Sequence, residues 1–126
     1  MDLSEIEKHF LLQFEESNEE LHMLENDVRL HFSSVDENSD SIRNRVRNTI
    51  RKLYDSGLID LRKFRYRKVR RNHFEVVNAV QLPDSDVDRL LNNSRSWDRD
   101  FQFHQTEKYY FQPTDKGIEC LDSCTP

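Results

Sequence analysis

Two asparagines and two arginines recur at helical spacing near the middle of the chain: Asn44, Arg47, Asn48 and Arg51. At about 100° per residue, these four side chains point to one side of a helix. An arginine can bind guanine O6 and N7, and an asparagine can bind adenine N6 and N7, each through two hydrogen bonds. Because a helix also fits the DNA major groove, this face predicts base recognition, with roughly 1–3 kcal/mol of discrimination per contact.

Further cations flank this face and continue in a second segment. On the predicted helix, Arg43, Arg45 and Lys52 are suited to phosphate contacts. A second set lies at the end of the first of two predicted strands and in the turn between them, where the residues of the turn could touch the DNA backbone or enter the minor groove. Its members are Arg67, Lys68, Arg70, Arg71 and His73. We expect both sets to belong to one DNA-binding surface.

Charge is strongly segregated along the sequence. Residues 43–71 hold twelve basic and two acidic residues and carry +10, whereas the 126-residue chain has a net charge of −5. Three arginines recur at intervals of four residues: Arg43, Arg47 and Arg51. Like charges at this spacing repel by a few tenths of a kcal/mol, which favours a polyanionic partner. The alternatives are cations that only solvate a surface, or that pair with the acidic residues 1–40, within the molecule or between protomers.

Other kinds of chemistry lack support. The five histidines, with Cys120 and Cys124, do not have the spacing of a metal site. The acidic run from Asp84 to Asp88 lacks the glycine and glutamate that a calcium loop requires further along. We therefore expect no enzyme activity, no cofactor and no metal.

No apolar run approaches the ~20 residues that cross a bilayer, and the acidic start is unlike a signal peptide, so a cytoplasmic location is expected.

The N-terminal region has helical periodicity. Residues 3–32 form either one long helix or two, with the second beginning at a capping-box pattern from Ser17 to Glu20. Three apolar residues lie off the main stripe: Leu12, Met23 and Leu30. They could form a second contact, such as a dimer interface, or they could belong to a loosely covered core helix. Residues 33–40 are polar turn formers.

The cationic segments fall on a helix and a hairpin. Residues 41–55 form the clearest helix, with Ser41 as N-cap and Gly57 after its end. Its predicted buried face consists of Ile42, Val46, Thr49, Ile50 and Leu53. Residues 58–69 and 74–82 predict a β-hairpin, with a bulge between Leu61 and Phe64. A short helix at 85–92, a loop at 93–100, a strand at 101–112 and a final helix capped by Thr114 follow.

This order of elements resembles the winged helix-turn-helix proteins, particularly bacterial and archaeal transcription regulators of the MarR, PadR and ArsR kind. Residues 42–59, IRNRVRNTIRKLYDSGLI, look like their recognition helix, which ends here at Leu53, Gly57, Leu58 and Ile59. Residues 109–121, YYFQPTDKGIECL, are similar to the strand that returns from the wing and enters the last helix at Thr114, Lys116 and Gly117. The chain departs from the pattern in two places: residues 33–40 hold no clear second helix, and residues 83–105 are longer than a wing needs.

The resemblance implies an α+β winged helix-turn-helix domain over residues 1–126. Its parts would be N-terminal helices within 1–32, a recognition helix at 41–55, a β-hairpin wing at 58–82, and a return strand and C-terminal helix at 109–121. The implied function is binding of double-stranded DNA, as a homodimeric transcription regulator at a palindromic site. The alternative is a winged-helix module that binds an acidic protein and no DNA, because a fold alone does not decide function. The sequence specifies neither the target site nor any small-molecule effector.

Overall fold

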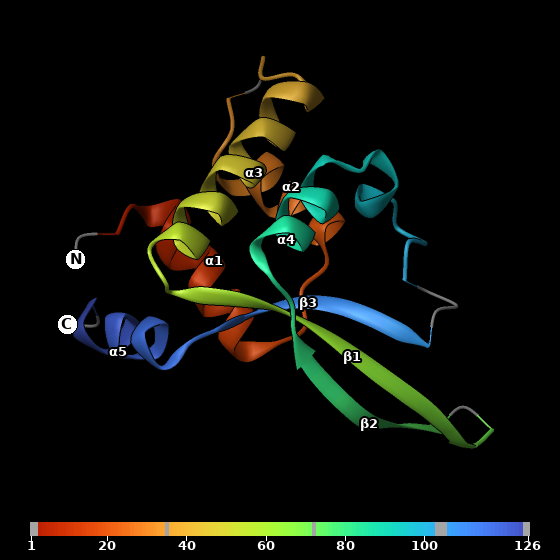
Figure 1. Cartoon of the computed structure of the whole chain (residues 1–126). Helices are drawn as coiled ribbons and strands as arrows, with labels where there is room; N and C mark the ends of the chain where they lie inside the picture. The colour runs from red at the N-terminus through yellow and green to blue at the C-terminus, as the bar shows by residue number, and fades with distance from the viewer. Residues whose placement is uncertain (1–2, 35, 72, 103–105, 125–126) are drawn as a thin grey trace.

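The computed structural model describes residues 3–34, 36–71, 73–102 and 106–124 and has an α+β fold (Figure 1). In chain order its elements are α1 (Glu5–Glu16), α2 (Leu21–His31), α3 (Ser39–Asp55), β1 (Ile59–Arg70), β2 (His73–Gln81), α4 (Asp84–Asn92), the 3-10 helix η1 (Ser94–Trp97), β3 (Glu107–Pro113) and α5 (Asp115–Cys124). The helices gather around one end of the sheet, and β1 and β2 extend away from them.

The N-terminal region forms two helices rather than one. A capping box starts α1, in which the Ser4 hydroxyl accepts from the Glu7 backbone at 3.2 Å and the Ser4 backbone donates to the Glu7 carboxylate at 2.7 Å. The predicted capping box at the start of α2 is wrong, because Glu20 is the N-cap and its side chain makes no capping hydrogen bond. Both helices bury one face, and Phe10, Leu24 and Val28 are fully inaccessible to solvent.

Helix α3 matches the predicted amphipathic pattern but begins earlier. Asn38, not Ser41, is the N-cap, and its side chain accepts from the Ser41 backbone at 2.8 Å. All five residues of the predicted apolar face are buried: Ile42, Val46, Thr49, Ile50 and Leu53. Gly57, with φ of 75°, ends the helix. The Gly57 and Leu58 amides donate to the Tyr54 and Leu53 carbonyls, which is the Schellman arrangement that requires a left-handed residue.

The sheet is antiparallel, in the order β2-β1-β3. The predicted hairpin is confirmed as β1 and β2. The bulge expected between Leu61 and Phe64 is wrong, because the register shifts lie further along, between Arg65 and Tyr66 and between Lys68 and Arg70. The phase change at Leu61 instead marks the point where β1 passes from buried to partly exposed residues.

Helix α5 is attached to the connection between α3 and β1. As predicted, Thr114 caps the helix, because its hydroxyl accepts from the Gly117 backbone at 3.1 Å. The same hydroxyl donates to the Gly57 carbonyl at 2.6 Å, and the Thr114 backbone donates to the Leu58 carbonyl at 3.0 Å. The predicted third strand, 101–112, is shorter than expected within the described residues and covers Glu107–Pro113 as β3; residues 103–105 lie outside the description.

Candidate nucleic-acid interface

Side chains of the predicted DNA-reading helix bind groups of the same chain. Arg43 donates to the Glu25 carboxylate from two nitrogens, at 3.0 and 3.2 Å. Arg45 donates to the Phe32 carbonyl at 2.7 Å and to the Glu37 carboxylate at 2.8 Å. Helix α2 and the following turn therefore supply the partners of these two arginines.

Helix α4 and η1 occupy the next part of the helix face. The Arg47 Nε donates to the Leu91 carbonyl at 2.8 Å. That carbonyl lies near the C-terminus of α4, where the helix dipole is negative and attracts a cation. The Trp97 indole N–H donates to the same carbonyl at 3.2 Å. The guanidinium groups of Arg43 and Arg47 lie 5.0 and 5.4 Å from the centre of the Trp97 ring, within cation–π range.

Arg51 is held by three carboxylates. It pairs with Asp55 at 3.0 Å within α3, with Asp88 at 3.0 Å, and with Asp84, the latter two both on α4. Desolvation would lower the pKa of Arg51, but its bonds to Asp84 and Asp55 outweigh this and raise the pKa above its ordinary value. The guanidinium therefore stays charged and neutralises part of the acidic start of α4.

Lys52 connects α3 to α1. Its ammonium lies 2.8 Å from the carboxylate of Glu7, a residue that is only 3% exposed. Burial would raise the pKa of Glu7, but hydrogen bonds from Lys52 and from Ser4 outweigh burial and hold the pKa below its ordinary value. The pair therefore anchors α3 to the N-terminal helix as an ionised bridge.

We expect Lys52→Met to remove a pH-dependent part of the stability. Because the pKa of Glu7 is lower in the folded state, the bridge stabilises above the ordinary glutamate pKa, about 4.3, and is lost as pH falls through the folded-state pKa. The free energy of unfolding in urea should fall by about 1–2 kcal/mol at pH 7 and hardly at pH 2. The matched control is Lys8→Met, because the Lys8–Glu5 pair is exposed and 3.7 Å apart. Equal losses in both variants would contradict the assignment.

The four predicted base-reading residues thus fall into two groups: the arginines bind other residues of the chain, and the asparagines are exposed. Arg47 and Arg51 are engaged within the chain, and Arg47 also donates to Asn44 at 3.0 Å. Asn44 and Asn48 remain exposed. The arginines of α3 repel one another, as their spacing predicts, and need groups that neutralise them. These groups belong to the same chain and are the Glu25 carboxylate, the Leu91 carbonyl and the carboxylates of α4.

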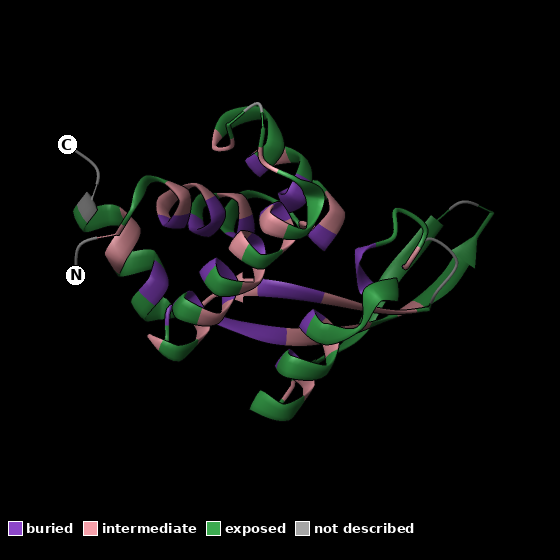
Figure 2. Ribbon diagram, turned by 90° about the horizontal axis from the view of Figure 1, so that it is seen from above, coloured by how far each residue is buried: buried purple, intermediate pink, exposed green. Residues whose placement is uncertain are grey.

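The cationic hairpin has a different environment. The ladder of β1 with β3 ends at Arg65 and Glu107, and one further bond joins the Tyr66 amide to the Thr106 carbonyl at 2.8 Å. Beyond Tyr66, β2 alone pairs with β1 among the residues that the structure describes. We call residues 67–80 the hairpin arm. Every described residue from Arg67 to Gln81 is exposed, and the arm appears as a green ribbon that extends away from the helices (Figure 2).

Free cations concentrate at the tip of the arm. Arg67 is bound to Glu75 across the ladder, and Lys63 and Arg65 lie 3.7 and 3.5 Å from Glu107. By contrast, three cationic side chains have neither an ion pair nor a hydrogen bond among the residues that the structure describes: Lys68, Arg70 and Arg71. His73 pairs with Arg70 in the ladder and completes the tip.

Aromatic side chains lie where the arm joins the sheet. The rings of Phe64 and Tyr66 are 6.5 Å apart, and Phe64 is 5.9 Å from Tyr110. The Lys108 ammonium lies 5.6 Å from the centre of the Tyr66 ring. Burial, followed by the neighbouring Tyr66 and Glu20, raises the pKa of Tyr110 to about 12, so its hydroxyl stays protonated at neutral pH. These rings therefore pack together at the base of the arm.

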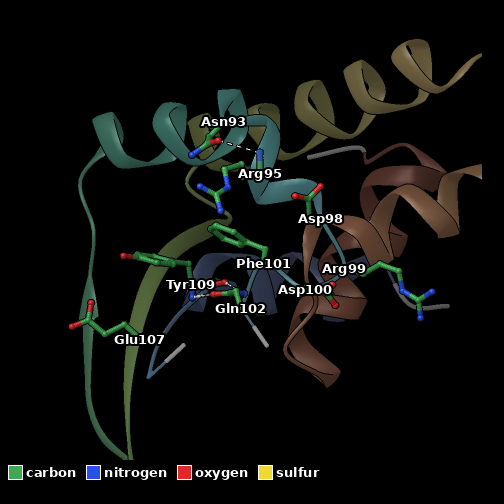
Figure 3. A pocket seen from close by; sticks show the side chains of 9 residues that line it. All are labelled: Asn93, Arg95, Asp98, Arg99, Asp100, Phe101, Gln102, Glu107 and Tyr109. Atoms are coloured by element: carbon green, nitrogen blue, oxygen red, sulfur yellow. Dashed lines mark hydrogen bonds between the residues drawn. The ribbon is translucent and has the colours of Figure 1, made fainter. Parts of the chain in front are cut away.

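An open pocket of about 790 Å³ lies between the end of α4, η1 and β3 (Figure 3). Its lining mixes Arg95 and Arg99 with three carboxylates, those of Asp98, Asp100 and Glu107. Gln102 bonds to both backbone groups of Tyr109 and so extends the edge of β3. This mixed charge does not select an anionic or a cationic ligand.

Comparisons with known proteins identify no relative: no protein-family model, curated protein or solved structure matches the chain. Among the described residues, no helix has both the length and the apolar character needed to span a membrane. The described residues also contain no cluster of three or more histidine, cysteine or acidic side chains able to hold a metal ion.

Proposed function

We propose that this protein binds double-stranded DNA through the tip of its hairpin arm. The observation that carries this proposal is the group Lys68, Arg70 and Arg71, which has no partner among the described side chains and lies at the end of a projecting ribbon. Such cations repel one another in the free protein, and phosphates would neutralise them with release of counterions.

The shape of the arm agrees with this role. A two-stranded ribbon fits into the major groove of B-DNA, which is about 12 Å wide. Arginine side chains are also attracted into narrow minor grooves, where the negative potential is strongest. Arg70 and Arg71 lie at the turn, and Lys68 lies two residues before Arg70, so a groove or its bordering phosphates can meet all three.

In this proposal α3 mainly supports the arm. For α3 to enter a groove, Arg47 would have to leave the Leu91 carbonyl and Arg51 would have to leave Asp84 and Asp88. The partly buried bond of Arg47 contributes roughly 1.5–3 kcal/mol and the exposed pairs of Arg51 roughly 0.2–1 kcal/mol each, so this exchange is costly. Asn48 is exposed and needs no such release, whereas Asn44 would have to give up the hydrogen bond that it accepts from Arg47 at 3.0 Å.

The same geometry supports a winged-helix relationship in a modified form. The order α3, Gly57, hairpin, β3 and α5 agrees with a recognition helix, wing, return strand and last helix. We propose that α4 and η1 are an insertion between the wing and the return strand. This insertion accounts for the extra length of residues 83–105 and covers Arg47 and Arg51 of α3.

Duplex binding measured against salt concentration tests the proposal. The wild type should bind at low salt, with log affinity falling by about 0.9 per neutralised phosphate for each unit of log salt. The double variant Arg70→Ala/Arg71→Ala should bind at least about 10-fold more weakly and lower this slope by about 2. The matched control is Arg95→Ala/Arg99→Ala, which removes the same charge from two exposed arginines outside the arm.

A third variant tests whether the arm or α3 makes the main contact with DNA. Asn44→Ala/Asn48→Ala should leave affinity and sequence preference unchanged if the arm makes the main contact. Loss of sequence preference in this variant would mean that α3, and not the arm, recognises the bases. No binding of the wild type to any duplex at low salt, or equal losses in the two arginine double variants, would overturn the proposal.

A second function is favoured by a different observation, the apolar surface of the arm. Val69, Phe74, Val76 and Val77 are each about half exposed, at 47, 53, 52 and 53%. Phosphates do not cover such groups, whereas a protein partner would. A protein-interaction module without DNA binding is therefore the alternative, and the duplex experiment discriminates between the two.

A further inference from the structure

The exposed apolar surface of the hairpin arm includes an aromatic ring close to its tip. Phe74 is the second residue of β2 and is 53% exposed. Among the described residues, its ring meets no other aromatic ring and lies outside the core cluster. The ring therefore contributes little to the packing of the described fold and is available to a partner.

The cross-strand neighbours of the exposed residues on β2 indicate what that partner is. Val80 lies opposite Lys63, whose ammonium is 3.7 Å from Glu107. Phe74 lies opposite Lys68, which has no ion pair among the residues that the structure describes. A partner of Phe74 therefore presents an apolar surface bordered by negative charge. Stacked base pairs between two rows of phosphates have this combination.

A bulge in β1 adds a second apolar side chain among the cations of the tip. The ladder passes from the pair Lys68–Phe74 to the pair Arg70–His73, so Val69 is the extra residue, and it is 47% exposed. Bulges increase the local twist of a ribbon and redirect a side chain, and they recur next to functional sites. The tip is thus both cationic and apolar, whereas a tip that only neutralised phosphates would need no apolar residue.

We propose that Phe74 inserts between two base pairs from the minor groove and kinks the duplex. This inference rests on the proposed DNA binding by the arm and extends it to the shape of the bound DNA. Lys68, Arg70 and Arg71 neutralise phosphates along the borders of the groove, and the ring replaces a stacking contact that the kink breaks.

The width of the minor groove is the reason for a kink. The groove is about 6 Å wide in B-DNA, and the two strands of a ribbon lie about 4.8 Å apart before their side chains are counted. The tip therefore enters only if the groove opens. An apolar wedge in a base step opens it, because it bends the duplex by roughly 20–90° toward the major groove.

The same mechanism predicts which sequences the arm prefers. Pyrimidine–purine steps, TA and CA/TG, unstack easily, whereas A-tracts are stiff. Two duplexes that differ only in a central TA or AA step should therefore differ in affinity, by roughly 10-fold in favour of TA. No base edge has to be read for this preference.

A contact in the major groove would also use the ring. There, an aromatic side chain can touch the methyl group of thymine without any kink. Duplexes in which uracil replaces thymine at the central step lack that methyl group. Their affinity should equal that of the thymine duplex, because a wedge does not depend on the methyl group.

Energy transfer between dyes at the two ends of a duplex of about 20 base pairs measures the bend. Saturation with the wild type should raise the transfer, because a kink brings the two ends closer together. Phe74→Thr should bind roughly 10-fold more weakly and give no increase at saturation, with the salt slope unchanged because all cations of the tip remain. Phe74→Leu should retain most of the bend, since leucine is also an effective wedge.

These variants separate the wedge from the folding of the arm. Threonine favours a strand more than leucine does, so damage to β2 would weaken Phe74→Leu more than Phe74→Thr, the opposite of the expected order. The matched control is Val77→Thr, because Val77 is also 53% exposed but lies outside the ladder with β1 and about 10 Å further from the tip than Phe74. It should bind and bend DNA as the wild type does.

The outcomes distinguish this inference from the proposed function. Binding that still depends on Arg70 and Arg71 but leaves the energy transfer unchanged would contradict the wedge alone, as would equal bending by Phe74→Thr and the wild type. Weaker binding to the uracil duplex would place Phe74 against thymine in the major groove and contradict the wedge as well. An absence of duplex binding, with or without binding to vesicles of anionic phospholipid, would contradict both proposals.

Discussion

Trp97→Ala is expected to lower the free energy of unfolding by about 3–5 kcal/mol, as removal of a buried aromatic side chain usually does. Trp97 is 3% exposed and belongs to the buried core cluster. Its ring also lies against two guanidinium groups, and its N–H shares the Leu91 carbonyl with Arg47. The substitution therefore removes apolar burial and loosens the contact of η1 and α4 with α3.

Urea unfolding followed by circular dichroism measures this effect. Trp97→Phe is the matched control, because it keeps a ring near Arg43 and Arg47 but loses the indole N–H. It should cost about 1–2 kcal/mol, from the lost hydrogen bond and the smaller ring. If Trp97→Ala costs no more than Trp97→Phe, the ring does not hold these elements together.

Gly117→Ala is expected to be comparably damaging, although the substitution adds only one methyl group. A Cβ at this position would lie 2.1 Å from the Leu58 carbonyl oxygen and 3.3 Å from a methyl carbon of Leu11. The Leu58 carbonyl belongs to the backbone and cannot rotate away as the end of a side chain can. Helix α5 would therefore have to move away from the α3–β1 connection. That movement would strain the Thr114 hydrogen bonds to Gly57 and Leu58, and we expect a loss of about 3 kcal/mol or more.

The adjacent position provides the control for Gly117→Ala. Ile118 lies on the same helix and is 38% exposed. Ile118→Ala should therefore cost less than about 1 kcal/mol in the same urea titration. Similar losses in the two variants would mean that any change in the packing of α5, and not the close approach to Leu58, sets the sensitivity of this helix, because alanine favours a helix more than glycine or isoleucine does.

Local patterns in the sequence predicted much of the fold. The period of apolar residues in α3 identified its buried face, and Gly57 marked its end because a left-handed residue is needed there. The hairpin followed from two apolar runs around a short turn. The N-cap of α3 was misplaced because Asn38 and Ser41 are both good capping residues, and only the observed bond to the Asn38 side chain distinguishes them.

The partners of the arginines could not be predicted in the same way. Arg47 and Arg51 are bound by residues more than thirty positions away, and sequence spacing does not say which helix will cover another. Pairing with acids of the N-terminal region was one alternative, and it is confirmed for Arg43, Arg45 and Lys52, which bind Glu25, Glu37 and Glu7. For Arg51 the acids come instead from α4, which supplies Asp84 and Asp88. One feature of the sequence could have indicated this pairing. Asp84 and Asp88 are spaced i,i+4 on a short helix, so one guanidinium can reach both carboxylates.

Strand β1 runs through two regions whose backbone amides differ in their protection from hydrogen exchange. Its first residues, Ile59 to Leu61, are buried and pair with β3, whereas its last residues form an exposed ladder with β2 alone among the residues that the structure describes. Amide hydrogen exchange should therefore become faster along this single strand, with the step after Tyr66, whose amide donates to the Thr106 carbonyl at 2.8 Å. Fraying from the tip can stop at that step without disturbing the core, so the arm can become ordered on a partner while the rest of the protein stays folded.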